Sequence, residues 1–191
     1  MVKEKVSNKV FLNKPEVQVL LLIIIEIIKL IKEKKEAINN KKISDPIKNP
    51  QIPGRLSESI ALHLLYDGKI VINDLKNPKD VNYGCSKKSA DLEVNTGKSD
   101  LKIEVKATGT STFQRFRPNA LLSKYIIWID FCGLRPNKSK ELTSDFSYAL
   151  FETKILDKFK KENSNEVDLD MKNIDESDFK IKPTTLNINS L

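Results

Sequence analysis

The chain has 191 residues, 39% hydrophobic and 31% charged, a composition typical of a soluble globular protein with one medium-sized core. Its formal net charge of +7 favours a polyanionic partner, with nucleic acid first and an anionic membrane second. The two cysteines, Cys85 and Cys132, are far apart and His63 is the only histidine, which argues against a disulfide scaffold, a cysteine zinc centre and any site built on two histidines.

The first predicted element is a helix over residues 15–39, apolar in its first half and rich in lysine at its end. Its apolar run from 17 to 31 is interrupted by Glu26 and Lys29 and is shorter than the ~20 residues that a spanning helix needs. The run therefore favours a buried or dimer-forming helix, and we expect no membrane partner. The charged start of the chain shows no signal peptide, which predicts a cytoplasmic protein.

A turn-rich stretch over residues 39–53, with Asp45-Pro46, Asn49-Pro50 and Pro53-Gly54, indicates a linker. We therefore divide the chain into an N-terminal helical segment with its linker, residues 1–50, and a main domain, residues 51–191. A second helix is predicted over residues 56–66, ended by Asp67-Gly68, and a short strand over residues 69–73.

Two segments with alternating apolar and polar residues, 89–94 and 101–108, are typical of half-buried strands and are joined by turn-forming residues. In an antiparallel hairpin, one register satisfies the whole apolar pattern. On the apolar face it pairs Val94 with Leu101, Leu92 with Ile103, and Ala90 with Val105. On the other face it pairs Glu93 with Lys102, Asp91 with Glu104, and Ser89 with Lys106.

The apolar run over residues 125–131 predicts a central strand, and residues 146–151 predict another, followed by a helix over residues 154–161. The chain after residue 162 is polar and rather acidic, with a late strand expected near residues 179–181. The predicted fold class is α/β (α+β): a mixed central β-sheet flanked by helices, with an N-terminal helix.

The hairpin register places the carboxylates of Asp91 and Glu104 directly across from each other, which is destabilising unless a cation lies between them. Magnesium prefers oxygen ligands and is usually held by one or two carboxylates plus substrate phosphate. Lys106 points to the same face, where its ammonium could orient water and offset charge on a phosphate. The alternative is an ordinary solvated strand face, as we expect for Glu93 and Lys102.

Asp91, separated by twelve residues from Glu104-Val105-Lys106, resembles the motif of the PD-(D/E)XK nuclease superfamily, over a core from about residue 56 to residue 131. In this chain Ala90 stands where the motif has proline. The resemblance implies a restriction-endonuclease-like fold in which residues 51–191 form the nuclease domain. It also implies that Asp91, Glu104 and the Val105 carbonyl bind Mg²⁺, or Mn²⁺ in its place, and that Lys106 assists the attacking water.

The same resemblance suggests Glu58, on the second helix, as a further metal contact through water. The alternative is a surface glutamate near a helix start, where the helix dipole favours a negative charge.

Residues 107–119 are rich in hydroxyl, amide and guanidinium groups, which fix phosphates and read base edges. We expect the DNA groove to be lined by Thr108, Ser111, Thr112, Gln114, Arg115, Arg117 and Asn119. Either arginine could contact guanine with two hydrogen bonds, and Lys87 and Lys88 are expected to contact phosphates. The alternative is a polar loop anchored in the core by Phe113 and Phe116.

The specific prediction is a Mg²⁺-dependent type II restriction endonuclease that cuts double-stranded DNA as a homodimer. The sequence contains neither a glycine-rich phosphate loop nor a dinucleotide-binding turn, so no nucleotide cofactor is expected. One alternative is a junction resolvase or repair nuclease of the same superfamily. The other is a non-catalytic protein that binds DNA or a membrane surface.

Overall fold

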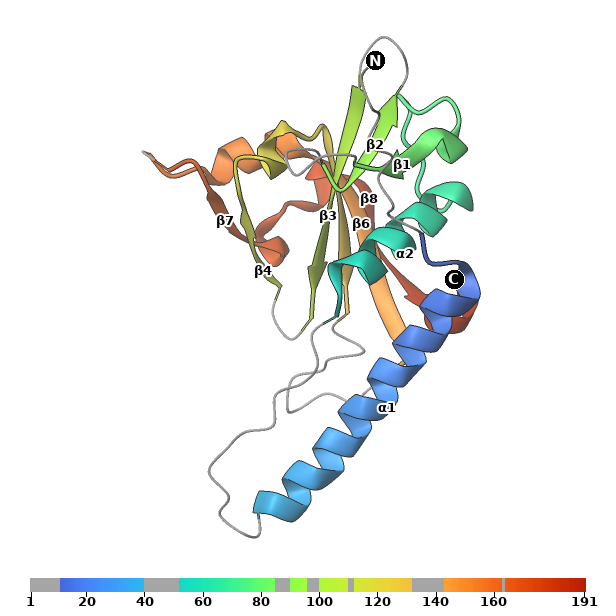
Figure 1. Ribbon diagram of the computed structural model, residues 1–191. Coiled ribbons are helices and arrows are strands. Elements are labelled where there is room, and N and C mark those ends of the chain that lie inside the picture. Colours follow the sequence, from blue (N-terminus) through green and yellow to red (C-terminus); the bar gives the residue numbers. More distant parts are fainter. Residues whose placement is uncertain are drawn as a thin grey trace, which may run out of the picture.

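The computed structural model describes residues 11–39, 52–84, 90–95, 100–109, 112–131, 143–162 and 164–191. The main sheet has six strands in the order β1-β2-β3-β5-β6-β8 (Figure 1). These are β1 (Val81–Tyr83), β2 (Leu92–Asn95), β3 (Asp100–Thr108), β5 (Tyr125–Asp130), β6 (Asp145–Glu152) and β8 (Phe179–Asn187). β3 and β5 are parallel, and the other neighbouring strands are antiparallel. The prediction of a mixed central sheet is confirmed.

β5 lies in the interior of this sheet, between β3 and β6, as its apolar run predicts. Residues 125–129 are all buried, because side chains on both faces of a central strand are covered. Its Ile127 and Ile129 pack on one face of the sheet, and Ile126 and Trp128 pack on the other. One central strand thus contributes to two separate hydrophobic clusters.

The helices α1 (Lys14–Asn39) and α2 (Gly54–Tyr66) match the two predicted helices within two residues at each end. Asn13 caps α1: its side chain accepts a hydrogen bond from the Glu16 N–H, and the Glu16 carboxylate accepts one from the Asn13 N–H, at 2.9 and 2.8 Å. After α2 the chain turns at Gly68, whose φ of +67° is costly for other residues. Among the described helices, none has the length and hydropathy needed to cross a membrane.

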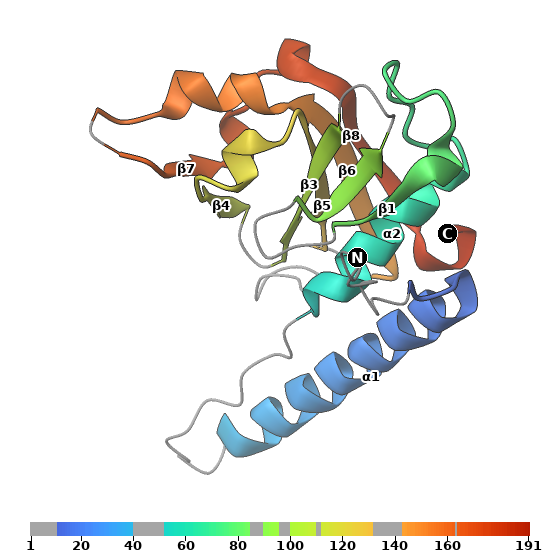
Figure 2. The same ribbon diagram turned by 45° about the horizontal axis from the view of Figure 1, so that its top comes forward.

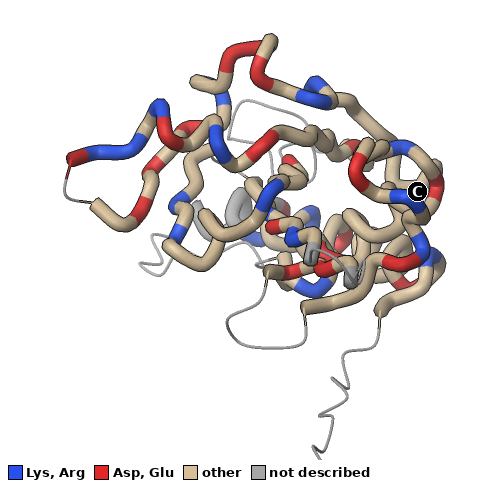
Figure 3. Tube along the Cα trace, turned by 90° about the horizontal axis from the view of Figure 1, so that it is seen from above, with Lys and Arg blue, Asp and Glu red and all other residues tan. Residues whose placement is uncertain are grey.

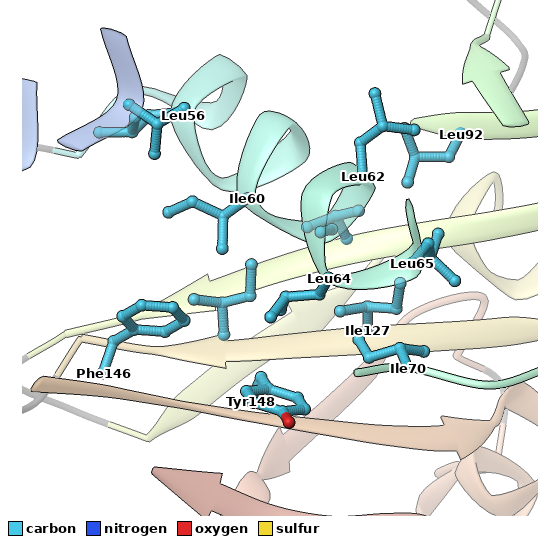
Figure 4. Packing of buried hydrophobic residues seen from close by; sticks show 14 of the residues in the cluster. Leu56, Ile60, Leu62, Leu64, Leu65, Ile70, Leu92, Ile127, Phe146 and Tyr148 are labelled. Atoms are coloured by element: carbon cyan, nitrogen blue, oxygen red, sulfur yellow. The ribbon is translucent and has the colours of Figure 1, made fainter. Parts of the chain in front are cut away.

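α2 covers one face of the main sheet, where its buried leucines and isoleucine meet the strands (Figures 2 and 4). Ile60, Leu64 and Leu65 point toward Ile127 and toward the aromatic rings of β6. α1 contributes to the same cluster through Val17, Leu21, Ile24, Ile25 and Ile28. The predicted N-terminal helix therefore shares the core of the sheet through one of its faces.

A second sheet of two strands, β4 (Phe113–Phe116) and β7 (Val167–Asp170), covers part of the opposite face. Neither strand was predicted. Residues 107–119 are rich in polar groups, which favours a loop, and the chain after residue 162 is polar and rather acidic. Phe116 and Leu169 anchor this sheet in the cluster around Trp128, whereas Phe113 is 51% exposed, so only one of the two phenylalanines is a core anchor.

One other local prediction was wrong, and one predicted helix is confirmed as a helix of the 3-10 type. Residues 69–73 form turns and coil instead of the predicted strand. Ile70 and Ile72 are nevertheless buried. The Ile70 N–H donates a hydrogen bond to the Leu64 carbonyl of α2, at 3.0 Å, and is therefore not available for pairing with a strand. The helix expected over residues 154–161 is a 3-10 helix over Thr153–Phe159. The strands expected near residues 146–151 and 179–181 are confirmed as parts of β6 and β8.

Candidate functional site

The hairpin of β2 and β3 has the predicted register. Leu92 lies opposite Ile103, Glu93 opposite Lys102, and Val94 opposite Leu101. The apolar members of these pairs pack in the cluster beneath α2. Because side chains alternate along a strand, Glu93, Glu104 and Lys106 belong to the other face, and Asp91 directly precedes β2. The predicted partner of Lys106, Ser89, lies outside the described residues.

Backbone pairing of the two strands ends at Leu92 and Ile103, so the expected pairs of Asp91 with Glu104 and of Ala90 with Val105 are not part of the ladder. Instead the side chain of Asp91 reaches across, and its Oδ2 accepts a hydrogen bond from the Val105 N–H at 2.8 Å. The backbone of Asp91 turns to the other neighbour, where its carbonyl accepts from the Gly84 N–H at 3.1 Å. The hairpin thus opens at Asp91, which lies near enough to Glu104 for the two charges to interact.

The carbonyl of Val105 faces this opening. In a strand, the N–H and C=O of one residue point to the same side. The Val105 N–H bonds the Asp91 carboxylate, so the Val105 carbonyl is directed to the same edge of β3. Asp91, Glu104 and the Val105 carbonyl therefore lie at the same end of the hairpin.

Glu104 is a buried acid, with 8% of its surface exposed. Burial raises its pKa above the usual range, and the nearby charge of Asp91 raises it further, while the ion pair with the Lys106 ammonium opposes both effects. The net direction is upward, so the folded protein disfavours the ionised form of Glu104. A second cation beside the two carboxylates would relieve this cost.

β5 lies beside Glu104 and Lys106 of β3 in the main sheet. In the parallel register Glu104 lies next to Ile126, and Lys106 lies next to the buried ring of Trp128. Apolar surfaces next to a charged pair exclude water and strengthen the electrostatic interactions between its members. The β3–β5 pairing was not predicted from the sequence, and neither was the position of Trp128 beside Lys106.

Thr108, which we expect to line the DNA groove, is buried within the fold. The residue is 4% exposed, and its hydroxyl donates to Asp130 Oδ1 and accepts from Trp128 Nε1, both at 2.8 Å. These bonds fix the end of β3 to β5. Asp130 follows directly after the apolar run of β5, and it could have been predicted as a partner only with the strand pairing known.

Thr112 and Gln114 are also occupied inside the protein. Thr112 is buried and donates its hydroxyl hydrogen bond to the Asp170 carboxylate. Gln114 is half-buried, and its Nε2 donates to the Ala107 carbonyl at 2.9 Å, which joins β4 to the strand that carries Lys106. Both side chains serve to attach the small sheet, because polar groups buried in a fold need partners.

The two arginines expected at the DNA differ in their surroundings. Arg115 on β4 is held by Asp168, with Nε–Oδ1 and Nη2–Oδ2 distances of 2.7 and 3.2 Å, and Glu166 lies 3.6 Å away. Two guanidinium nitrogens of Arg115, Nε and Nη2, therefore already donate hydrogen bonds within the fold. Arg117 and Asn119 are exposed, and Arg117 forms no ion pair within the described residues. Lys87, Lys88 and Ser111 lie outside the described residues.

Glu58 folds back over the first turn of α2. Its Oε1 lies 3.8 Å from the place where a Cβ on Gly54 would lie, and its Oε2 lies 3.9 Å from Arg55 Nε. The Arg55 guanidinium in turn lies 4.8 Å above the ring of Tyr83. The Glu58 side chain is only 17% exposed, and both interpretations of Glu58, as a surface residue of the helix start and as a water-mediated metal contact, stay predictions.

The donors gathered at the hairpin suit a hard cation. Among the described residues, no three His, Cys, Asp or Glu side chains are arranged to hold a metal ion. The pair of Asp91 and Glu104 with one carbonyl matches the way magnesium is usually held, with water and substrate phosphate completing its shell. The set fits magnesium better than zinc, which prefers nitrogen and sulfur.

Basic and acidic residues are interspersed over the described part of the chain (Figure 3). Acidic residues slightly outnumber basic ones there, so the positive surplus of the whole chain comes from the segments outside it. Those segments include Lys87, Lys88 and Lys98, which flank the two strands of the hairpin in the sequence, and Arg135, which follows β5.

Comparisons of the chain with protein-family models, with curated proteins and with solved structures find no match.

Proposed function

We propose that the protein is a magnesium-dependent nuclease that hydrolyses phosphodiester bonds in double-stranded DNA, most specifically a type II restriction endonuclease. One observation carries this proposal: Asp91 and Glu104 approach each other at the open end of a hairpin, with Lys106 paired to Glu104. The chemical class rests on these three groups, and the choice of DNA rests on the positive charge of the chain.

The proposed roles follow from the contacts of each group. The Asp91 carboxylate is fixed by the Val105 N–H through Oδ2, which leaves Oδ1 to hold the ion together with Glu104 and the Val105 carbonyl. When bound, magnesium would polarise the phosphate and lower the pKa of a bound water. Lys106 would leave Glu104 for the water or the phosphate, where its ammonium offsets developing negative charge.

The reaction is a hydrolysis and needs no other reactant. The water oxygen forms a new bond to phosphorus, and the bond from phosphorus to one sugar oxygen breaks. That sugar oxygen takes up a proton, and the second water proton is released to solvent. The role of Lys106 is to hold and orient the attacking oxygen through hydrogen bonds from its side-chain amine.

A junction resolvase or repair nuclease of the same superfamily is the nearest alternative, because its metal site would use the same three groups. The two differ in substrate: a restriction enzyme cuts plain duplex at one short sequence, and a resolvase needs branched DNA. A non-catalytic DNA-binding protein would cut neither.

Purified protein with magnesium is expected to cut a plasmid of known sequence into discrete fragments and to leave it intact in excess EDTA. Lys106→Met is expected to slow cleavage by about 100-fold or more, because it removes the donor beside the phosphate and keeps the length of the side chain. The matched control is Lys102→Met, since Lys102 lies on the same strand and face; it should change the rate by less than about threefold.

Equal rates for the two methionine variants would remove Lys106 from the chemistry. Cutting restricted to a four-way junction substrate would support the resolvase, and the absence of cutting on both substrates would contradict the proposed function.

A further inference from the structure

The helix α1 is apolar on two sides. One side contributes Val17, Leu21, Ile24, Ile25 and Ile28 to the core. The other side carries Leu20, Ile23, Ile27 and Leu30, here named the α1 stripe, whose members are 39%, 48%, 40% and 56% exposed. At 100° per residue these four positions form one stripe along the helix, centred about 120° around the helix axis from the buried side.

The stripe has the spacing of a helix–helix seam. Its members follow one another at intervals of three, four and three residues, which is the repeat of the core positions in a two-stranded coiled coil. Large apolar residues that adjoin one another on a surface are typical of an interface. α1 has 26 residues, so it is long enough for such a seam (Figures 1 and 2).

The stripe is complementary to itself when a second copy lies antiparallel. Position 25 is the midpoint of the pairs 20 with 30 and 23 with 27, so antiparallel helices bring Leu20 opposite Leu30 and Ile23 opposite Ile27. The same symmetry brings Glu16 opposite Lys34, and both residues are exposed on the line of the stripe. A parallel pair would instead place like charges together at both ends.

We propose that two copies of this chain associate through the α1 stripe as an antiparallel, two-fold symmetric helix pair. Apolar side chains form the centre of the contact, and a Glu16–Lys34 pair closes each end. A two-fold interface needs such a self-complementary surface. This inference does not rest on the proposed nuclease chemistry, because it uses no residue of the hairpin.

Sedimentation equilibrium of the full-length chain tests the proposal. The wild type is expected to be a dimer at micromolar concentration, and Ile27→Lys should raise the dissociation constant by at least about 30-fold. Leu22→Lys is the matched control: Leu22 lies on the same helix and is 42% exposed, against 40% for Ile27, but it lies off the stripe. This control should change the constant by less than about threefold. Circular dichroism would establish that both variants keep their fold.

Charge exchange tests the orientation. Lys34→Glu and Glu16→Lys should each weaken an antiparallel dimer, because each places like charges opposite one another. The double variant should associate more tightly than Glu16→Lys alone. Both of these variants lack the Glu16 capping contact with Asn13, so the comparison is not affected by its loss.

Three results would overturn the proposal. These are a wild type that stays monomeric at about 100 µM, equal effects of Leu22→Lys and Ile27→Lys on the dissociation constant, or a double charge variant that associates no more tightly than Glu16→Lys alone. A monomer that binds phosphatidylserine vesicles and loses this binding with Ile27→Lys would assign the stripe to a membrane surface instead.

Discussion

Glu104→Gln is expected to abolish cleavage and, in the absence of metal, to raise the thermal stability of the protein. Glutamine keeps the shape of the side chain and removes the charge that burial and Asp91 both disfavour. Loss of a carboxylate that would hold the cation should reduce the rate of plasmid cleavage by more than about 100-fold. A gain in stability together with a loss of activity is typical of a site whose charges are arranged for function.

The stability gain should depend on pH with a defined sign. Folding raises the pKa of Glu104. The contribution of Glu104 to the free energy of unfolding of the wild type is therefore highest at low pH, where Glu104 is protonated in both the folded and the unfolded state. It falls as the pH rises through the folded pKa and Glu104 becomes ionised. Wild type and Glu104→Gln should therefore melt alike in acid, and the variant should melt at a higher temperature near neutral pH. Melting curves in EDTA check this, and a variant less stable than the wild type at neutral pH would contradict the account of Glu104.

Asp91→Asn and Asp91→Ala are expected to lose cleavage equally but to differ in stability. An asparagine oxygen can still accept the hydrogen bond from the Val105 N–H, whereas alanine leaves that N–H without its acceptor. We expect Asp91→Ala to lose about 1–3 kcal/mol of unfolding free energy relative to Asp91→Asn. Urea unfolding measures this difference, and plasmid digestion measures the common loss of more than about 100-fold in rate.

Comparison of Asp91→Asn with Asp91→Ala separates two roles of the Asp91 carboxylate, as a hydrogen-bond acceptor and as a negatively charged metal ligand. Cleavage retained by Asp91→Asn would show that the negative charge of Asp91 is not needed, which would contradict its proposed role as a charged metal ligand. Equal stability of the two variants would mean that water replaces the lost acceptor.

The sequence predicts the carboxylate pair because a period of two has only one register that buries every apolar residue of the hairpin. The register of β2 and β3 is therefore confirmed, and so is the interior position of β5, whose run of apolar residues suits burial on both faces. The end of the ladder at Leu92 could not be predicted, because it depends on a side chain replacing a backbone partner.

The surroundings of the site depend on long-range pairing, which leaves no local pattern. Thr108 looks like a polar loop donor in the sequence, and only the parallel contact of β3 with β5 reveals Asp130 and Trp128 as its partners. Likewise Arg115 looks available for DNA until β4 pairs with β7 and brings Asp168 beside it. The hydrophobic pattern predicts which residues are buried together locally, and topology decides which polar groups meet.

Binding of Mn²⁺, followed by the loss of the free-ion signal in electron paramagnetic resonance, tests the carboxylate pair without requiring DNA or turnover. We predict that the wild type binds the ion, that Asp91→Asn and Glu104→Gln each weaken binding by at least about tenfold, and that Glu93→Gln on the same hairpin leaves it unchanged. Equal binding by all four proteins, or none by the wild type, would contradict the central claim that Asp91 and Glu104 together hold a cation.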